Sequence, residues 1–112
     1  MTEASPEYEA VAGENDLQEG GLLGVEVDGQ RIVLAKLQGK VYALGAVCTH
    51  KGADLSEGVI EGEMIRCPWH HSGFDIRTGA VVRPPAREPE PVYDVKLEDG
   101  QIWVSRRPRG TG

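Results

Sequence analysis

The sequence is organised around two short cysteine–histidine motifs, Cys48-Thr49-His50 and Cys67-Pro68-Trp69-His70. The chain has two cysteines and three histidines, so both cysteines and every histidine except His71 fall within these motifs. Two thiolates and two imidazoles form a donor set that suits iron–sulfur clusters or zinc. The pattern therefore predicts a metal centre whose ligands are Cys48, His50, Cys67 and His70.

The residues that flank the motifs resemble the cluster-binding loops of the Rieske [2Fe–2S] family. Residues 48–55 are similar to the first loop of that family, and residues 67–79 are similar to the second. In the family each loop supplies one cysteine and one histidine. The resemblance implies one [2Fe–2S] cluster per chain, with the buried iron held by Cys48 and Cys67 and the outer iron held by His50 and His70.

Length and composition indicate one small domain covering residues 1–112. No apolar run approaches the roughly 20 residues that a membrane helix needs. The stretch Met1–Ala10 is acidic and polar, without the basic and apolar regions of a signal peptide. Binding both cysteines to iron leaves none for a disulfide, which agrees with a reducing compartment. We therefore expect a soluble cytoplasmic protein.

The charge is unevenly distributed along the chain. The formal net charge is −6, and no Lys or Arg precedes Arg31. This acidity argues against nucleic acid or an anionic membrane as a partner. An acidic face could steer docking onto a basic redox partner, or the acidity could serve only to keep the protein in solution, and the sequence leaves both interpretations open.

Short apolar runs separated by glycine-containing turns predict an all-β fold. Asp28-Gly29 between residues 22–27 and 31–37 predicts a hairpin. The proline-rich residues 83–91 cannot form a central strand. No segment has helical periodicity, so we expect antiparallel strands packed as a sandwich or barrel. Further strands are expected at 8–12, 40–47, 59–60, 64–66, 74–76, 80–82, 92–97 and 101–105.

The Rieske resemblance also implies how such a domain is divided. A small cluster-binding subdomain, about 46–84, is expected to sit on a larger β base, with flexible tails at about 1–6 and 106–112. The proline-rich segment matches a loop that covers the cluster in the family. The alternative interpretation is that this segment is only a rigid linker.

Residues around the predicted ligands point to a low reduction potential within the Rieske range of about −150 to +300 mV. High-potential members of the family have two further cysteines, whose positions here are taken by Ala53 and Trp69. They also place a serine and a tyrosine near the cluster. Ser72 matches the serine, whereas Phe74 replaces the tyrosine, so one hydrogen-bond donor to the cluster is lost.

The leading functional hypothesis is a ferredoxin that carries single electrons. The resemblance implies that it takes them from an NAD(P)H-dependent flavin reductase and passes them to an oxygenase, such as a ring-hydroxylating dioxygenase. Such a carrier is not itself an enzyme, and no catalytic residues are assigned. A mononuclear iron site would need two further histidines and a carboxylate, and only His71 is spare, so this chain is not a complete oxygenase.

Two alternatives remain. The chain could be the Rieske domain or small subunit of a larger oxidoreductase, either a nitrite reductase or a flavin reductase related to apoptosis-inducing factor. The His70-His71 pair resembles that flavin reductase group, and the basic residues 106–112 could be a linker. A structural zinc module is the second alternative, because two cysteines and two histidines also suit zinc.

Overall fold

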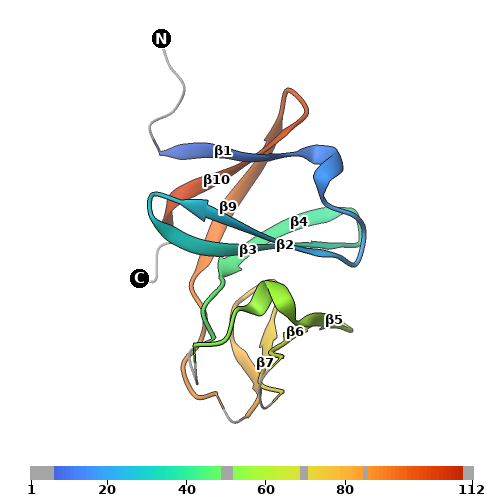
Figure 1. Ribbon diagram of the computed structural model, residues 1–112, viewed down its shortest axis with the longest axis vertical. Helices are drawn as coiled ribbons and strands as arrows, with labels where there is room; N and C mark the ends of the chain where they lie inside the picture. Colours follow the sequence, from blue (N-terminus) through green and yellow to red (C-terminus); the bar gives the residue numbers. More distant parts are fainter. Residues whose placement is uncertain (1–6, 49–51, 69–70, 85, 110–112) are drawn as a thin grey trace.

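A computed structural model describes residues 7–48, 52–68, 71–84 and 86–109, which form two antiparallel sheets (Figure 1). The larger sheet has the strand order β1-β10-β9-β4-β3-β2, and the smaller has the order β5-β6-β7-β8. The all-β fold predicted from the sequence is confirmed. The elements are β1 (Tyr8–Gly13), η1 (Glu14–Asp16), β2 (Leu22–Val27), β3 (Gln30–Leu37), β4 (Lys40–Gly45), η2 (Leu55–Glu57), β5 (Val59–Glu61), β6 (Met64–Arg66), β7 (Gly73–Asp75), β8 (Val81–Arg83), β9 (Val92–Glu98) and β10 (Gln101–Pro108).

Three tight turns build the larger sheet. Each has two central residues with positive φ, the second of which is glycine. This is the backbone of a type I′ turn, whose twist matches that of the strands it joins. The hairpin predicted at Asp28-Gly29 is confirmed, with Leu22 opposite Ala35 in the register of β2 and β3. The other two turns lie at Gln38-Gly39 and Asp99-Gly100.

The larger sheet curls into a nearly closed barrel, because its edge strands β1 and β2 come into contact (Figure 1). A cluster of buried apolar side chains from β2, β3, β4, β9 and β10, with Leu17, forms one of two cores among the described residues. Its buried members are Leu17, Val27, Ile32, Leu34, Ala43, Tyr93, Ile102 and Val104.

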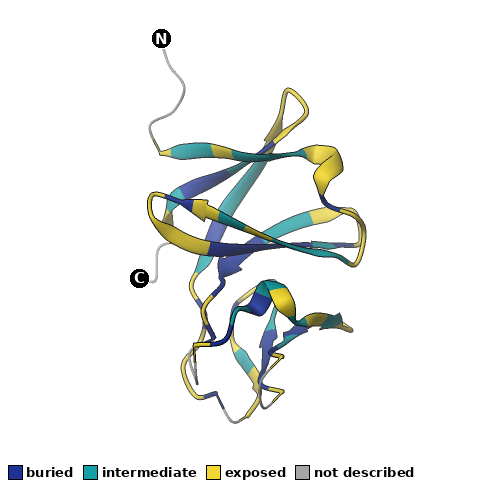
Figure 2. Cartoon of the chain, in the orientation of Figure 1, coloured by how far each residue is buried: buried dark blue, intermediate teal, exposed yellow. Residues whose placement is uncertain are grey.

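The middle of strand β3, residues 32–35, is buried on both faces (Figure 2). Ile32 and Leu34 belong to the first core, whereas Val33 and Ala35, which alternate with them, belong to a second core. This second core includes buried residues of β6 and β7, so the smaller sheet is packed against the outer face of β3 and β4. It also contains both cysteines. The outer face of β3 and β4 therefore packs against the core that contains the two predicted cysteine ligands.

The carboxyl-terminal strand is longer than expected. From the sequence we placed its end at Ser105 and a flexible tail from residue 106 onward, but β10 continues to Pro108. The backbone N–H of Arg106 donates to the Glu7 carbonyl at 2.8 Å, and that of Arg109 donates to the Val92 carbonyl at 2.6 Å. Residues 106–108 therefore belong to the sheet and Arg109 is hydrogen-bonded to it, while the predicted tail at 1–6 and residues 110–112 lie outside the described residues.

The short helices η1 and η2 were not predicted, because three-residue helices carry no hydrophobic period. Within the part of the chain that the structure describes, no helix is long and apolar enough to cross a membrane.

Candidate metal centre

The first predicted ligand loop follows β4 and closes on itself. The Cys48 N–H donates to the Ala53 carbonyl at 2.8 Å, and the Gly52 N–H donates to the Cys48 carbonyl at 2.8 Å. Gly52 has a φ of 80°, a conformation that glycine adopts without strain. Val47 and Asp54 form a bridge at the neck of the loop. His50, the second predicted ligand of this loop, lies outside the described residues.

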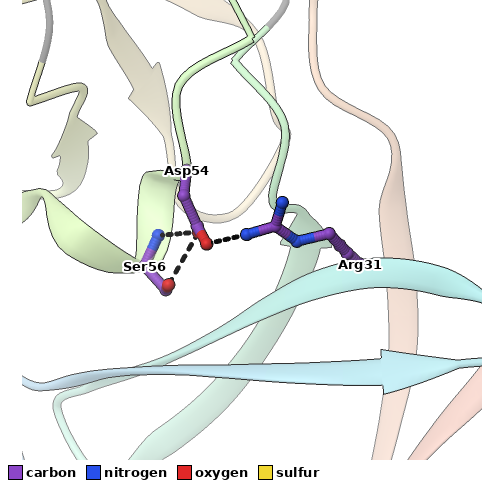
Figure 3. A network of polar contacts seen from close by, with 3 residues as sticks. All are labelled: Arg31, Asp54 and Ser56. Atoms are coloured by element: carbon purple, nitrogen blue, oxygen red, sulfur yellow. Dashed lines mark hydrogen bonds and ion pairs between the residues drawn. The ribbon is translucent and has the colours of Figure 1, made fainter.

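The neck of the first loop is attached to β3 by backbone and side-chain contacts. The Ala46 N–H donates to the Arg31 carbonyl at 3.0 Å. The Asp54 carboxylate accepts hydrogen bonds from the Ser56 N–H at 2.9 Å and from its hydroxyl at 2.6 Å, and it also pairs with the Arg31 guanidinium (Figure 3). Burial opposes ionisation of Asp54, but the hydrogen bonds from Ser56 and the charge of Arg31 outweigh it, so the pKa of Asp54 lies below its ordinary value.

The second predicted ligand loop joins β6 to β7 and has the same closure. The Cys67 N–H donates to the Ser72 carbonyl at 2.7 Å. Ser72 is fully buried, and its hydroxyl accepts a hydrogen bond from the Ala86 N–H at 3.0 Å. A hydroxyl that accepts in this way still has its own proton to donate. Ser72 therefore links the loop to the proline-rich segment and has a donor available for a further acceptor.

The proline-rich segment is attached at two further points. The Glu90 N–H donates to the Gly79 carbonyl at 2.9 Å, and the Gly45 N–H donates to the Pro91 carbonyl at 2.9 Å. A Cβ atom on Gly79 would lie only 2.2 Å from the Glu90 carbonyl oxygen. The segment thus lies against β4, the β7–β8 turn and the second ligand loop.

His71 is the histidine that the predicted ligand set leaves spare. Its φ is 64°, in the left-handed region that few residues other than glycine adopt, and its side chain is exposed. Its neighbours His70 and Trp69 lie outside the described residues.

The two cysteines suit the thiolate half of an iron–sulfur site. Cys48 is 2% exposed and Cys67 is 1% exposed, and they belong to the same core without forming a disulfide. Two soft sulfur donors in a largely apolar setting fit a cluster iron. In the described parts of the chain no group of three or more His, Cys, Asp or Glu could hold a metal ion. The complete ligand set, which needs His50 and His70, remains a prediction.

Phe74 lies beside the predicted site, carries no hydroxyl and is deeply buried. Phe74 is fully buried within the second core, where it faces Ile65 across β6 and β7. Its ring therefore contributes apolar packing at the position where the Rieske resemblance expected a tyrosine in high-potential proteins.

Comparison with known proteins matches residues 7–102 to the family described as "Rieske [2Fe-2S] domain". The chain belongs to this family. The resemblance inferred from the two motifs is confirmed, and membership of the Rieske family supports an iron–sulfur cofactor. The matched span includes both predicted ligand loops and most of the barrel.

Relatives of this Rieske chain include the ferredoxin component of the naphthalene 1,2-dioxygenase system of Pseudomonas putida, with 38% identity over 80% of this chain and 86% of the relative. Apoptosis-inducing factor 3 of Homo sapiens is 36% identical over 85% of this chain, a match that covers 16% of that protein. Among solved structures, "Complex of reduced oxygenase and oxidized ferredoxin in carbazole 1,9a-dioxygenase" contains a chain that matches with a TM-score of 0.88 and 28% identity, covering 95% of this chain and 99% of that one.

Several contacts of the site were missed from the sequence. Arg31 and Asp54 are 23 positions apart, and nothing in the local sequence marks them as partners. Ser72 and Ala86 are likewise brought together only by the fold. One signal was available, because Asp-x-Ser is typical of a turn in which the carboxylate accepts from the residue two positions on, as Asp54 does from Ser56.

Proposed function

We propose that this Rieske protein is a one-electron carrier with one [2Fe–2S] cluster per chain, held by Cys48, His50, Cys67 and His70. The observation that carries the proposal is the burial of Cys48 and Cys67 in a single core, each at the start of a loop that closes by the same backbone hydrogen bond. When bound, the cluster supplies a centre that accepts and releases one electron at a time.

The residues of the chain would divide the tasks of holding and tuning this centre. Cys48 and Cys67 would bind the inner iron on the side of the barrel wall. His50 and His70 would bind the outer iron, and their neutral imidazoles leave the site less negative than four thiolates would, which eases reduction. The buried Ser72 hydroxyl would donate to a cluster sulfur. We also propose that residues 46–84 act as a cluster-binding subdomain on the barrel base.

The proposed electron donor is an NAD(P)H-dependent flavin reductase, and the proposed acceptor is an oxygenase of the ring-hydroxylating type. Support comes from the relative named as a ferredoxin component of a dioxygenase system. The matched structure of an oxygenase together with a ferredoxin supports an oxygenase as the partner. On this proposal the chain shuttles electrons between the two in the cytoplasm and carries out no substrate chemistry of its own.

A reconstituted electron-transfer assay tests the proposal. The purified chain should contain two irons and two labile sulfides and absorb visible light. NADH with a flavin reductase should reduce it under anaerobic conditions, and a ring-hydroxylating oxygenase should then reoxidise it. A colourless protein with one bound zinc would support the structural zinc module instead, and a coloured protein that no oxygenase reoxidises would overturn the choice of acceptor.

The second candidate is a Rieske domain or small subunit within a larger oxidoreductase. It is favoured by the match to apoptosis-inducing factor 3, in which the matching region is only 16% of the protein. The structure titled "Crystal Structure of putative NADH-dependent nitrite reductase small subunit from Mycobacterium tuberculosis" is also similar, with a TM-score of 0.81 and 27% identity over 91% of this chain and 96% of that one. A Gly-x-Gly-x-x-Gly fingerprint between a strand and a helix, encoded in frame beyond Gly112, would favour a fused flavin reductase.

A further inference from the structure

We propose that Arg31 and Asp54 are a positioning pair that holds the neck of the first ligand loop and so determines how firmly Cys48 retains the cluster. This inference rests on the proposed ligand set, because it concerns the loop that would supply Cys48 and His50. Neither Arg31 nor Asp54 is a predicted ligand. Both act through the backbone that leads into and out of the loop.

Arg31 contacts both ends of the loop, through its carbonyl at the entry and through its guanidinium, which pairs with Asp54, at the exit. Its carbonyl accepts from the Ala46 N–H at 3.0 Å, on the segment that enters the loop. The Ala46 carbonyl in turn accepts from the Leu55 N–H at 2.7 Å, on the segment that leaves it. Asp54 directly follows Ala53, whose carbonyl accepts from the Cys48 N–H. Asp54 is therefore adjacent in the chain to the residue that accepts the hydrogen bond from Cys48, so a shift of Asp54 can disturb that bond.

The carboxylate of Asp54 is fully occupied at this neck. One oxygen accepts both donors of Ser56, and the other pairs with the Arg31 guanidinium (Figure 3). The Asp54 side chain is 20% exposed, whereas that of Arg31 is 57% exposed. An ion pair of this kind adds little to global stability. Because the pair lies at the neck of the loop, its removal should change the local stability of the loop more than the global stability of the protein. The experiment therefore measures a property of the loop.

Strand β2 also lies against the Asp54–Ser56 turn. A Cβ atom on Gly24 would lie 3.0 Å from the Ser56 Oγ and 3.2 Å from the Ser56 Cβ. Glycine at this point leaves room for the Asp54–Ser56 turn to lie against the barrel. Gly24→Ala therefore offers a second way to displace the turn, without changing any charge.

The chain contains a matched control pair. Arg109 Nε lies 2.9 Å from an Asp94 carboxylate oxygen, and the two side chains are 56% and 47% exposed. This pair also joins an arginine to an aspartate, but it links β9 to the residue after β10 within the larger sheet. Removing it tests whether loss of any exposed ion pair changes cluster retention.

The experiment measures the rate of cluster release from the intact holoprotein. Arg31→Gln, Asp54→Asn, the double variant, Arg31→Lys, Gly24→Ala and Asp94→Asn are compared with the parent protein by the decay of visible absorbance in the presence of an iron chelator. Arg31→Gln removes a positive charge and Asp54→Asn removes a negative one. A purely electrostatic influence would therefore shift the reduction potential of the two variants in opposite directions. Loosening of the loop would instead speed cluster release in both variants.

We expect Arg31→Gln and Asp54→Asn each to release the cluster several-fold faster, and the double variant to be no faster than the faster single variant. Arg31→Lys should restore part of the retention, Gly24→Ala should speed release, and Asp94→Asn should match the parent. The EPR signal of the reduced cluster should broaden in both single variants, which a change in global stability alone would not cause.

Parent-like release rates in Arg31→Gln and Asp54→Asn would overturn the inference, as would equal acceleration in Asp94→Asn. If a single variant failed to fold, the rates of Arg31→Lys and Gly24→Ala would decide, and parent-like release in both would overturn it. A parent protein that holds no [2Fe–2S] cluster would instead overturn the proposed function, so the two failures are distinguishable.

Discussion

The two ligand loops share one backbone closure but are attached to different parts of the molecule. In each, the cysteine N–H donates to the carbonyl five positions on, Ala53 in the first loop and Ser72 in the second. The first loop is fixed to the barrel wall through β3 and a partly exposed carboxylate. The second is fixed to the proline-rich segment through a fully buried hydroxyl.

This difference implies that the two loops lose their structure in response to different changes. Leaving a buried donor without its partner costs more than breaking an ion pair that water can replace. The second loop should therefore contribute more to global stability. The first loop, whose charged neck faces solvent, should respond more to pH and to salt.

At the cysteines themselves the two loops should behave alike. We expect Cys48→Ser and Cys67→Ser each to abolish stable cluster binding, because both thiolates are proposed to bind the same iron. Iron content and visible absorbance of the purified variants measure this, with Ser105→Ala as a control for substitution of a buried residue away from the site. Full iron content with an unchanged EPR signal in either serine variant would remove that cysteine from the ligand set.

Detaching the proline-rich segment should have the next largest effect. Gly79→Ala places a Cβ atom 2.2 Å from the Glu90 carbonyl oxygen at a φ of +76°, whereas Gly100, with a φ of +73°, has no atom within 4 Å of a Cβ. Gly100→Ala should therefore cost only the backbone strain, about 1–2 kcal/mol. Gly79→Ala should cost a further 1–3 kcal/mol, roughly, for the clash. Urea unfolding gives both values, and equal losses would mean that the segment moves aside freely.

Removing the buried hydroxyl of the second loop should affect both stability and potential. Ser72→Ala leaves the Ala86 N–H without its acceptor, which should cost about 1–3 kcal/mol. Ser105 is a matched control, because its buried hydroxyl accepts from the Asp94 N–H at 3.0 Å and donates to the Arg107 carbonyl at 2.8 Å. Both variants should be destabilised, but voltammetry should find a lower potential only in Ser72→Ala. A potential that stays unchanged would show that Ser72 donates no hydrogen bond to the cluster.

The smallest expected effect is the pH response of the first loop. Because the pKa of Asp54 lies below its ordinary value of 3.8, its ionised form stabilises the loop above that pH. That contribution, about 1 kcal/mol or less for a partly exposed pair, is lost as the pH falls through the lowered pKa. Hydrogen exchange corrected for its intrinsic pH dependence should show the Leu55 amide losing protection in acid, while the Ala86 amide keeps it. Loss of protection at both amides together would contradict the distinction between the loops.

Much of the fold followed from local sequence signals. Asp28-Gly29 located a hairpin because only certain residues tolerate positive φ at both turn positions. Residues Ile32–Ala35 are all apolar because this part of β3 is buried on both faces. A strand buried on one face only would need apolar residues at alternate positions. Cys67 directly follows β6, as predicted, whereas β4 ends at Gly45, two residues before the predicted end at residue 47, so Cys48 lies within the loop.

What the sequence did not reveal depends on contacts between distant segments. The Arg31–Asp54 pair and the Ser72–Ala86 hydrogen bond each join residues that have no regular spacing. The extension of β10 to Pro108 depends on pairing with the start of β1 and with β9, which no property of the basic residues 106–109 indicates. Tertiary context therefore decided the attachment of both loops.

The central claim is that Cys48, Cys67, His50 and His70 hold one [2Fe–2S] cluster. Pulsed EPR of the dithionite-reduced protein, with and without ¹⁵N-labelled histidine, tests it most directly. We predict a Rieske-type signal coupled to two histidine nitrogens, and loss of one coupling, or of the cluster, in His50→Cys and in His70→Cys. A reduced protein with no paramagnetic signal, or one with a signal that lacks histidine coupling, would contradict the account.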